Sequence, residues 1–306
     1  MARIVKDLYQ RFRDENIVGK YIYANVAVYL VFALIGVVAT LFNAVGVADG
    51  VFSIFRLPAD TARLLIQPWS VLTYMFMHAG IMHLLWNMFA LYVFGRIFVT
   101  FFSTRHFIGV YLLGGIIGGL FFVLSYNIFP FFEDDVKSSY LVGASAAVLA
   151  VVVASAVRSP NYTVNLMFAG GMRLSRLAIV TVLISLLFVT SDNAGGNIAH
   201  LGGALAGFLF AIMLNKGRDL TTPINAACSF LAGLWGKVYR WIKEHRTDIR
   251  IVKPGRRSDR EADYEYNARK KDENDEIDRI LEKLSQGGYS SLTEEEKRRL
   301  YDASHK

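Results

Sequence analysis

The sequence predicts an all-α membrane protein, a bundle of six transmembrane helices with a small cytoplasmic helical extension at its C-terminus. The chain has 306 residues, of which 54% are hydrophobic and only 19% are charged, and its mean hydropathy is +0.35. Soluble domains carry more charge than this. The charge is also uneven, because residues 216–306 hold 20 of the 33 Lys and Arg side chains. We therefore expect a multi-pass bundle followed by a charged region.

Uncharged stretches define the expected spans, since a hydrocarbon core of about 30 Å needs about 20 helical residues. The six expected spans are residues 21–43, 81–100 (with Arg96 near its end), a helix within 106–132, 138–157, a short helix at 177–191, and 193–215. The bundle would thus cover residues 21–215, after an N-terminal segment of residues 1–20. We expect no cleavable signal peptide, because the first apolar run is long enough to span.

Basic residues orient the bundle by the positive-inside rule. They precede the first span, follow the second (Arg96, Arg105) and follow the fourth (Arg158), so these segments and both termini are expected in the cytoplasm. The acidic stretch 133–135 and the long first loop, 44–80, fall on the outside, and the loop is expected to lie in the membrane interface. This topology predicts a multi-pass protein of the inner (plasma) membrane.

Three segments follow the bundle. Residues 216–245 place apolar side chains at helical 3/4 spacing between lysines and arginines, which predicts an amphipathic helix on an anionic lipid surface. Residues 246–271 are rich in mixed charge and predict a disordered linker. Residues 272–306 predict a cytoplasmic helical hairpin, in which Thr293 and Glu296 form a capping box.

The net charge of +7 does not indicate a nucleic-acid partner, because Lys and Arg in a membrane chain set topology and contact lipid headgroups. We expect the lipid bilayer and membrane proteins as partners, and no nucleic acid. The single cysteine, Cys228, excludes an intrachain disulfide framework and a multi-cysteine metal site.

Polar side chains inside the spans are costly and so indicate function. His83 and Asn87 are four residues apart and share one helix face. Ser145 follows Gly143 in a stretch of small residues, and His200 precedes Gly203 and Gly207. Glycines at this spacing allow two helices to pack closely.

Ser145 alone is more typical of helix packing than of catalysis. If the glycines after His200 pack on the stretch that contains Ser145, the two side chains can meet, and a neutral imidazole can then activate the hydroxyl. A dyad without a carboxylate suits this setting, because a third, ionised partner would be expensive to desolvate.

These motifs resemble those of the rhomboid intramembrane serine proteases. The resemblance covers residues 21–215 and lies in His78-(x4)-His83-(x3)-Asn87, Gly143-Ala-Ser145, and Ala199-His200-Leu-Gly-Gly203-(x3)-Gly207. It implies that Ser145 is the nucleophile and His200 the base. It also implies that His83 and Asn87 stabilise the oxyanion, and that His78, Gly143, Gly203 and Gly207 are structural residues near the site. The C-terminal hairpin resembles tails of rhomboids from Bacteroidetes-like bacteria.

The sequence departs from the rhomboid pattern at several positions. Ser70 stands where an arginine usually follows the tryptophan, and Val99 and Thr100 stand where an acidic residue is expected. Ala146 replaces a glycine, and Leu149 replaces an aromatic residue whose ring could stack on His200. The change at Leu149 puts the orientation of the dyad in question.

The resemblance implies an endopeptidase that cleaves transmembrane substrates near the outer membrane face, without a cofactor and without a metal. The alternative is a proteolytically silent relative that binds or escorts membrane proteins. A metal site at His78, His83 and His200 is disfavoured because no carboxylate or thiolate accompanies them. A transporter is disfavoured because the spans contain no buried charges.

Overall fold

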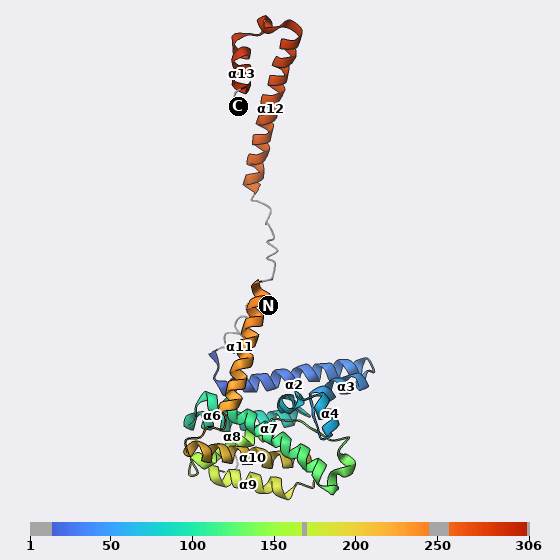
Figure 1. Ribbon diagram of the computed structural model, residues 1–306, viewed down its shortest axis with the longest axis vertical. Coiled ribbons are helices and arrows are strands. Elements are labelled where there is room, and N and C mark those ends of the chain that lie inside the picture. The colour runs from blue at the N-terminus through green and yellow to red at the C-terminus, as the bar shows by residue number, and fades with distance from the viewer. Residues whose placement is uncertain (1–13, 167–169, 245–256, 305–306) are drawn as a thin grey trace. The chain divides into compact units, whose positions relative to one another are not determined.

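The computed structural model describes residues 14–166, 170–244 and 257–304 (Figure 1). It divides into two compact units, Met1–Lys237 and Val238–Lys306, which are described separately. The first unit is a bundle of apolar helices, and its β-structure consists of two-residue and four-residue strands. The expectation of an all-α membrane protein is confirmed.

Four helices of the first unit are long and apolar enough to cross a membrane: α2 (Ile17–Leu41), α6 (Ile81–Phe101), α7 (Thr104–Ile128) and α10 (Ala194–Asn215). The fourth expected span is shorter than predicted, whereas the fifth is short as expected and begins three residues earlier. Helices α8 (Ser145–Arg158) and α9 (Leu174–Leu187) have 14 residues each. At 1.5 Å per residue each is about 21 Å long, less than the thickness of the hydrocarbon core.

The fourth expected span, 138–157, is helical only from Ser145 onward. Before it, β2 (Tyr140–Leu141) pairs antiparallel with β1 (Leu57–Pro58), and Gly143 has φ +125°, a left-handed value that favours glycine. The strand pairing and the glycine therefore delay the helix, and Ser145 becomes its first residue.

The long first loop is folded. It contains three helices besides β1, and it continues into a 3-10 turn: α3 (Val45–Phe55), α4 (Thr61–Ile66), α5 (Ser70–Thr73) and η1 (Tyr74–Phe76). Side chains hold these pieces together, since Trp69 Nε1 donates to the Ile54 carbonyl (2.9 Å) and Thr73 Oγ1 donates to the Phe55 carbonyl (2.8 Å). In Figure 1, α3 lies beside α2. Its position in the membrane interface stays a prediction.

Helix α8 is the centre of the bundle, and every residue from Ala146 to Ala156 is buried. It packs against α6, α7, α9 and α10. A Cβ at Gly203 or Gly207 of α10 would collide with the carbonyl oxygen of Ala146 or Ala150 of α8. The expected close contact between these two stretches is thus present, and it depends on backbone approach that only glycine permits.

The connections between the last helices are short. A 3-10 helix, η2 (Pro130–Asp135), leads from α7 to β2, and an antiparallel hairpin of β3 (Thr163–Leu166) and β4 (Gly170–Arg173) leads from α8 to α9. Helix α11 (Thr222–Glu244) follows α10. This range is helical as the sequence predicts, and its contact with lipid stays a prediction.

The C-terminal unit consists of α12 (Arg257–Gly287), η3 (Tyr289–Ser291) and α13 (Glu294–Ser304). The expected capping box is present, since Glu296 N donates to Thr293 Oγ1 (3.3 Å) and Thr293 N donates to a Glu296 carboxylate oxygen (2.7 Å). Disorder over residues 246–271 was a wrong expectation for 257–271, which are helical in α12. The remainder of that linker lies outside the described residues.

Candidate active site

His83 and Asn87 lie on the first turns of α6, and both are held by bonds within this region. The backbone N–H of Ala79 points at His83 Nδ1 (3.4 Å), which leaves the proton of a neutral ring on Nε2. Asn87 is buried, and its Nδ2 donates to the His83 carbonyl (2.9 Å). The ring of His78 packs edge-on against His83, with 5.2 Å between the ring centroids. His83 can therefore act as a hydrogen-bond donor through Nε2.

Gly143 lets the ring of His83 approach the backbone just before Ser145. A Cβ at this glycine would lie 2.9 Å from His83 Nε2 and 3.8 Å from Ser145 Oγ. The N–H of Gly143 donates to the Tyr74 carbonyl (3.0 Å), which fixes the strand before the serine. A side chain at position 143 would therefore collide with the His83 ring, and the glycine allows His83 Nε2 and the Ser145 hydroxyl to lie on the same side of this backbone.

Ser145 is the first residue of α8, preceded by Ala144, whose side chain provides no cap. The N–H groups of the first turn of a helix have no partner within the helix, and they attract negative charge. Ser145 is half-buried, and among the described residues its hydroxyl makes no hydrogen bond. Its position thus combines a free hydroxyl with free backbone donors.

His200 is placed against this end of α8 by the glycines that follow it. Gly203 and Gly207 lie one and two turns after His200 and contact Ala146 and Ala150, which follow Ser145. Within the described part of the chain, no hydrogen bond joins Ser145 to His200. The structure therefore brings the two helices together without closing the expected dyad, and such contacts often tighten only when substrate is bound.

Ser185 of α9 is a site residue that the sequence did not reveal. Its Oγ lies 3.1 Å from His200 Nδ1, and the side chain is only 2% exposed. Ser185 precedes His200 by 15 positions, and the turn around Asp192 lies about midway between them. If the helices on either side of this turn run antiparallel, the two residues lie side by side at the same height along the helices. That symmetry about the turn is the signal that could have identified Ser185.

A cavity of about 420 Å³ adjoins His83 and the residues before Gly143. Its walls include His83, the stretch 139–142, two aromatic side chains of α7, and the residues that lead into α10, among them Asp192 and Asn193. The space is large enough for several water molecules. Water can thus reach the level of the site.

The length of α8 indicates the depth of Ser145. The helix ends at Arg158, whose charged side chain belongs at a membrane surface, and Ser145 lies about 20 Å away along the axis. Because the hydrocarbon core is about 30 Å thick, Ser145 lies below the opposite surface. We therefore expect the hydroxyl below the membrane surface, near His83, which lines a cavity that can hold water.

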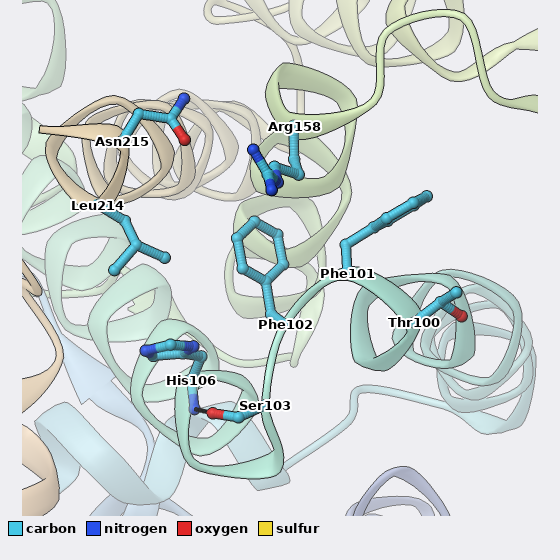
Figure 2. Close-up of a pocket in the computed structure, with 8 residues that line it drawn as sticks. All are labelled: Thr100, Phe101, Phe102, Ser103, His106, Arg158, Leu214 and Asn215. Carbon is cyan, nitrogen blue, oxygen red and sulfur yellow. Dashed lines mark hydrogen bonds between the residues drawn. The ribbon is translucent and has the colours of Figure 1, made fainter. Parts of the chain in front are cut away.

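A separate cavity, of about 370 Å³, lies at the other end of α8 and contains Arg158 (Figure 2). Its other walls come from the junction of α6 with α7 and from the end of α10. It shares no residue with the cavity at His83, so it is not part of the candidate site. Among the described residues, no group of three or more His, Cys, Asp or Glu side chains is arranged to hold a metal ion.

Known families match two parts of this chain. Residues 66–217 match the rhomboid domain, and residues 260–306 match a family of unknown function (DUF6576). The first match includes His78, His83, Asn87, Ser145 and His200. The second falls in the C-terminal unit, so the two matches correspond to different parts of the structure.

Three curated proteins resemble the chain over about 150 residues. RHOMBOID-like protein 12, mitochondrial, of Arabidopsis thaliana is 28% identical over 49% of this chain and 47% of its own length. RHOMBOID-like protein 6, mitochondrial, of the same plant is 32% identical over 48% of this chain and 44% of its own length. Rhomboid-like protease 1 of Toxoplasma gondii is 25% identical over 49% of this chain and 48% of its own length. This chain thus spans less than half of the length of each of these relatives.

Proposed function

We propose that this chain, which belongs to the rhomboid family, is an intramembrane serine endopeptidase that cleaves transmembrane helices of other proteins. The observation that carries the proposal is the close approach at Gly143, where Ser145 Oγ and His83 Nε2 both lie beside the backbone, at the end of α8 that packs on the helix of His200. A peptide carbonyl bound at this end of α8 would have a nucleophile and a hydrogen-bond donor nearby.

In the proposed reaction, Ser145 Oγ attacks the scissile carbonyl carbon and its proton passes to Nε2 of His200. The oxyanion that forms accepts hydrogen bonds from His83 Nε2, Asn87 Nδ2 and the backbone N–H of Ser145. His200 then gives its proton to the departing amine. Water from the cavity at Asp192 and Asn193 hydrolyses the acyl-enzyme, with His200 again as base.

A substrate helix would enter beside α9. This helix buries only Leu174, Ala178 and Ser185, and most of its large apolar side chains are exposed. Little packing is therefore lost when another helix lies against it. The substrate must unwind near the site, because the hydrogen bonds of an intact helix shield its carbonyl groups.

The proposal includes the membrane topology. Arg96 lies near the C-terminal end of α6, and Arg158 is the last residue of α8. Arg173 and Arg176 lie at the start of α9, so all four are at the ends of these helices opposite to His83, Ser145 and Ser185. By the positive-inside rule, both termini are cytoplasmic, cleavage occurs near the outer face, and the chain resides in the inner (plasma) membrane of a bacterium. Labelling of single cysteines introduced at Ser139 and Ser159 with an impermeant reagent tests this orientation, since only the first should react from outside.

A second candidate function is that of a silent binder of membrane proteins. Two observations favour it. Among the described residues, no hydrogen bond joins Ser145 to His200, and no aromatic ring stacks on the imidazole of His200. Such a protein would hold substrate helices at α9 without cutting them.

Cleavage in proteoliposomes separates the two functions. The purified protein is reconstituted with a reporter that has one transmembrane helix, and Ser145→Ala is compared with Ser155→Ala, a buried serine on the same helix that bonds only to the Val151 carbonyl. The protease proposal predicts cleavage by the wild type and by Ser155→Ala, and none by Ser145→Ala. A folded wild type that binds reporters but cleaves none would support the binder.

A further inference from the structure

The imidazole of His200 can accept the proton of Ser145 at Nε2 only if its other nitrogen, Nδ1, carries a proton. A neutral imidazole has two tautomers, and the partner of Nδ1 decides between them. In serine proteases with a triad, a carboxylate fulfils this task. In the described structure, the group at Nδ1 of His200 is the Ser185 hydroxyl, at 3.1 Å.

The direction of this hydrogen bond follows from the second contact of Ser185. Its hydroxyl donates its single proton to the Thr181 carbonyl, one turn earlier on α9, at 3.0 Å. With its proton on this carbonyl, the oxygen has only lone pairs to offer, and it accepts from Nδ1–H of His200. The alternative, in which the hydroxyl donates to an unprotonated Nδ1, would leave the Thr181 carbonyl without this bond. Nε2 is left unprotonated and without a hydrogen bond among the described residues.

We infer that Ser185 is a positioning residue that holds His200 in the Nδ1–H tautomer, and that it replaces both the missing carboxylate and the missing aromatic ring. This inference rests on the proposed function, because it assigns His200 the role of base. Ser185 touches no reacting atom and acts through the imidazole.

A hydroxyl suits this position better than a carboxylate would. Ser185 is buried, and an ionised group there would lose its hydration without a cation to compensate. The hydroxyl supplies one accepting oxygen and no charge. Its own proton is satisfied by the helix, so the bond to His200 leaves no polar atom of Ser185 without a partner.

The end of α9 is fixed to α10 at two points, which makes the arrangement rigid. Besides the bond from His200 to Ser185, Asn197 Nδ2 donates to the Phe188 carbonyl (2.8 Å) and to Ser191 Oγ (3.3 Å). Asn197 and His200 are three residues apart and therefore share one face of α10. The orientation of the imidazole is thus tied to the last turn of α9.

The tautomer can be observed directly. The protein is produced with ¹⁵N in its histidine rings, and the His200 signals are identified by their loss in His200→Gln. We expect a protonated Nδ1 and an unprotonated Nε2 in the wild type and in Ser155→Ala, which loses a matched buried serine that bonds only within its own helix. In Ser185→Ala we expect a mixture of tautomers. Ser185→Thr, which keeps the hydroxyl and its bond to the preceding turn, should restore the wild-type signals.

Turnover gives the second readout. Ser185→Ala should lower kcat about 10 to 100-fold, the size expected when a reacting group loses its alignment. KM should change little, and Ser185→Thr should recover most of the activity while Ser155→Ala stays near wild type. A protonated Nε2 in the wild type, or equal tautomers and turnover in Ser185→Ala and Ser155→Ala, would overturn the inference.

The inference and the proposed function can fail separately. The tautomer can be read in the Ser145→Ala background, where no cleavage is possible. A wild type that never cleaves but shows the Nδ1–H tautomer, lost in Ser185→Ala, would refute the protease proposal and support the assignment of Ser185.

Discussion

Each end of the bundle holds a histidine with one nitrogen near a polar partner, and the two partners differ. One of these histidines is His106, which Figure 2 shows. Its Nε2 lies 3.5 Å from a carboxylate oxygen of Asp219, a residue outside that view, and about a quarter of each side chain is exposed. At the candidate site, the partner of His200 is the buried hydroxyl of Ser185. A charged partner keeps part of its hydration where water reaches it, whereas burial of a neutral hydroxyl loses less hydration free energy than burial of a carboxylate.

The surroundings of the two rings differ as well. His106 packs against Phe102 and Phe210, with ring centroids 6.3 and 5.6 Å away. The hydroxyl beside it is that of Ser103, which caps the start of α7 by accepting from the backbone N–H of His106 (3.2 Å). His200 instead lies one turn before Gly203, which brings its helix onto the end of α8 that begins with Ser145. We therefore assign stability to the pair at His106 and chemistry to the pair at His200.

Exchange of each histidine for glutamine gives the largest expected difference between the two ends. His200→Gln should lower cleavage about 10⁴-fold or more, because the base is lost. His106→Gln should cleave at nearly the wild-type rate per folded molecule. Initial cleavage rates on a transmembrane reporter in proteoliposomes measure the activity of both variants. Equal losses of rate would mean that the two histidines do not differ in their roles.

Asn87→Ala should lower kcat about 10 to 1000-fold, as expected for removal of one oxyanion donor. The matched control is Asn25→Ala, because Asn25 is also buried and also donates to the carbonyl four residues earlier, at 2.8 Å. Both variants lose a similar local bond, and only Asn87 faces the proposed oxyanion. A turnover for Asn87→Ala no lower than that of Asn25→Ala would remove it from this role.

Gly203→Ala should destabilise the bundle by about 1 to 3 kcal/mol, because the new methyl group collides with the Ala146 carbonyl and forces α8 away from α10. Gly46→Ala in α3 is the control, since nothing lies within 4 Å of a Cβ there. Reversible unfolding in mixed detergent compares the two. A Gly203→Ala protein as stable as Gly46→Ala would contradict the close contact.

Asp219→Asn tests the other end and should have the smallest effect, about 1 kcal/mol at neutral pH. Partial burial raises the pKa of Asp219. The hydroxyl and the backbone N–H of Thr221 donate to its carboxylate at 2.6 and 2.8 Å, and they lower the pKa by more than burial raises it. His106 and Thr222 lower it further. The pKa of Asp219 in the folded protein is therefore below its usual value. The ionised carboxylate stabilises the fold above the usual pKa of an aspartate, and this stabilisation is lost as the pH falls through the pKa of the folded protein.

Unfolding midpoints of wild type and Asp219→Asn, measured from pH 7 downward, check that sign. The wild type should be the more stable at neutral pH, and the gap should close below about pH 4. A gap that widens in acid would mean that the carboxylate does not stabilise this end of the bundle.

The sequence predicts the bundle and its central seam well because these depend on local patterns. Uncharged runs identify the apolar helices, and Gly203 and Gly207 identify the helix face that packs on α8. The late start of α8 was not predictable, because it depends on β1, which lies more than 80 residues earlier and pairs with the stretch before Gly143. Hydropathy alone cannot detect such a pairing.

The remaining differences have similar causes. Mixed charge in residues 257–271 predicted disorder, but charges such as Glu265 and Arg269, at i and i+4, also favour a helix, and α12 covers them. Ser185 gave no local signal, since a lone serine in an apolar helix commonly bonds to the preceding turn. Only the placement of α9 beside α10 shows that the same hydroxyl contacts His200.

The most direct test of the account is to map the site of covalent labelling by a fluorophosphonate, because two serines lie near His200 and only one can be its nucleophile. Ser185 is buried and donates its proton to Thr181, whereas the Ser145 hydroxyl is free at the end of α8. Peptide mass spectrometry of the labelled wild-type protein should place the adduct on Ser145, with no label in Ser145→Ala or His200→Gln. An adduct on Ser185, or a folded protein that takes no label, would contradict the account.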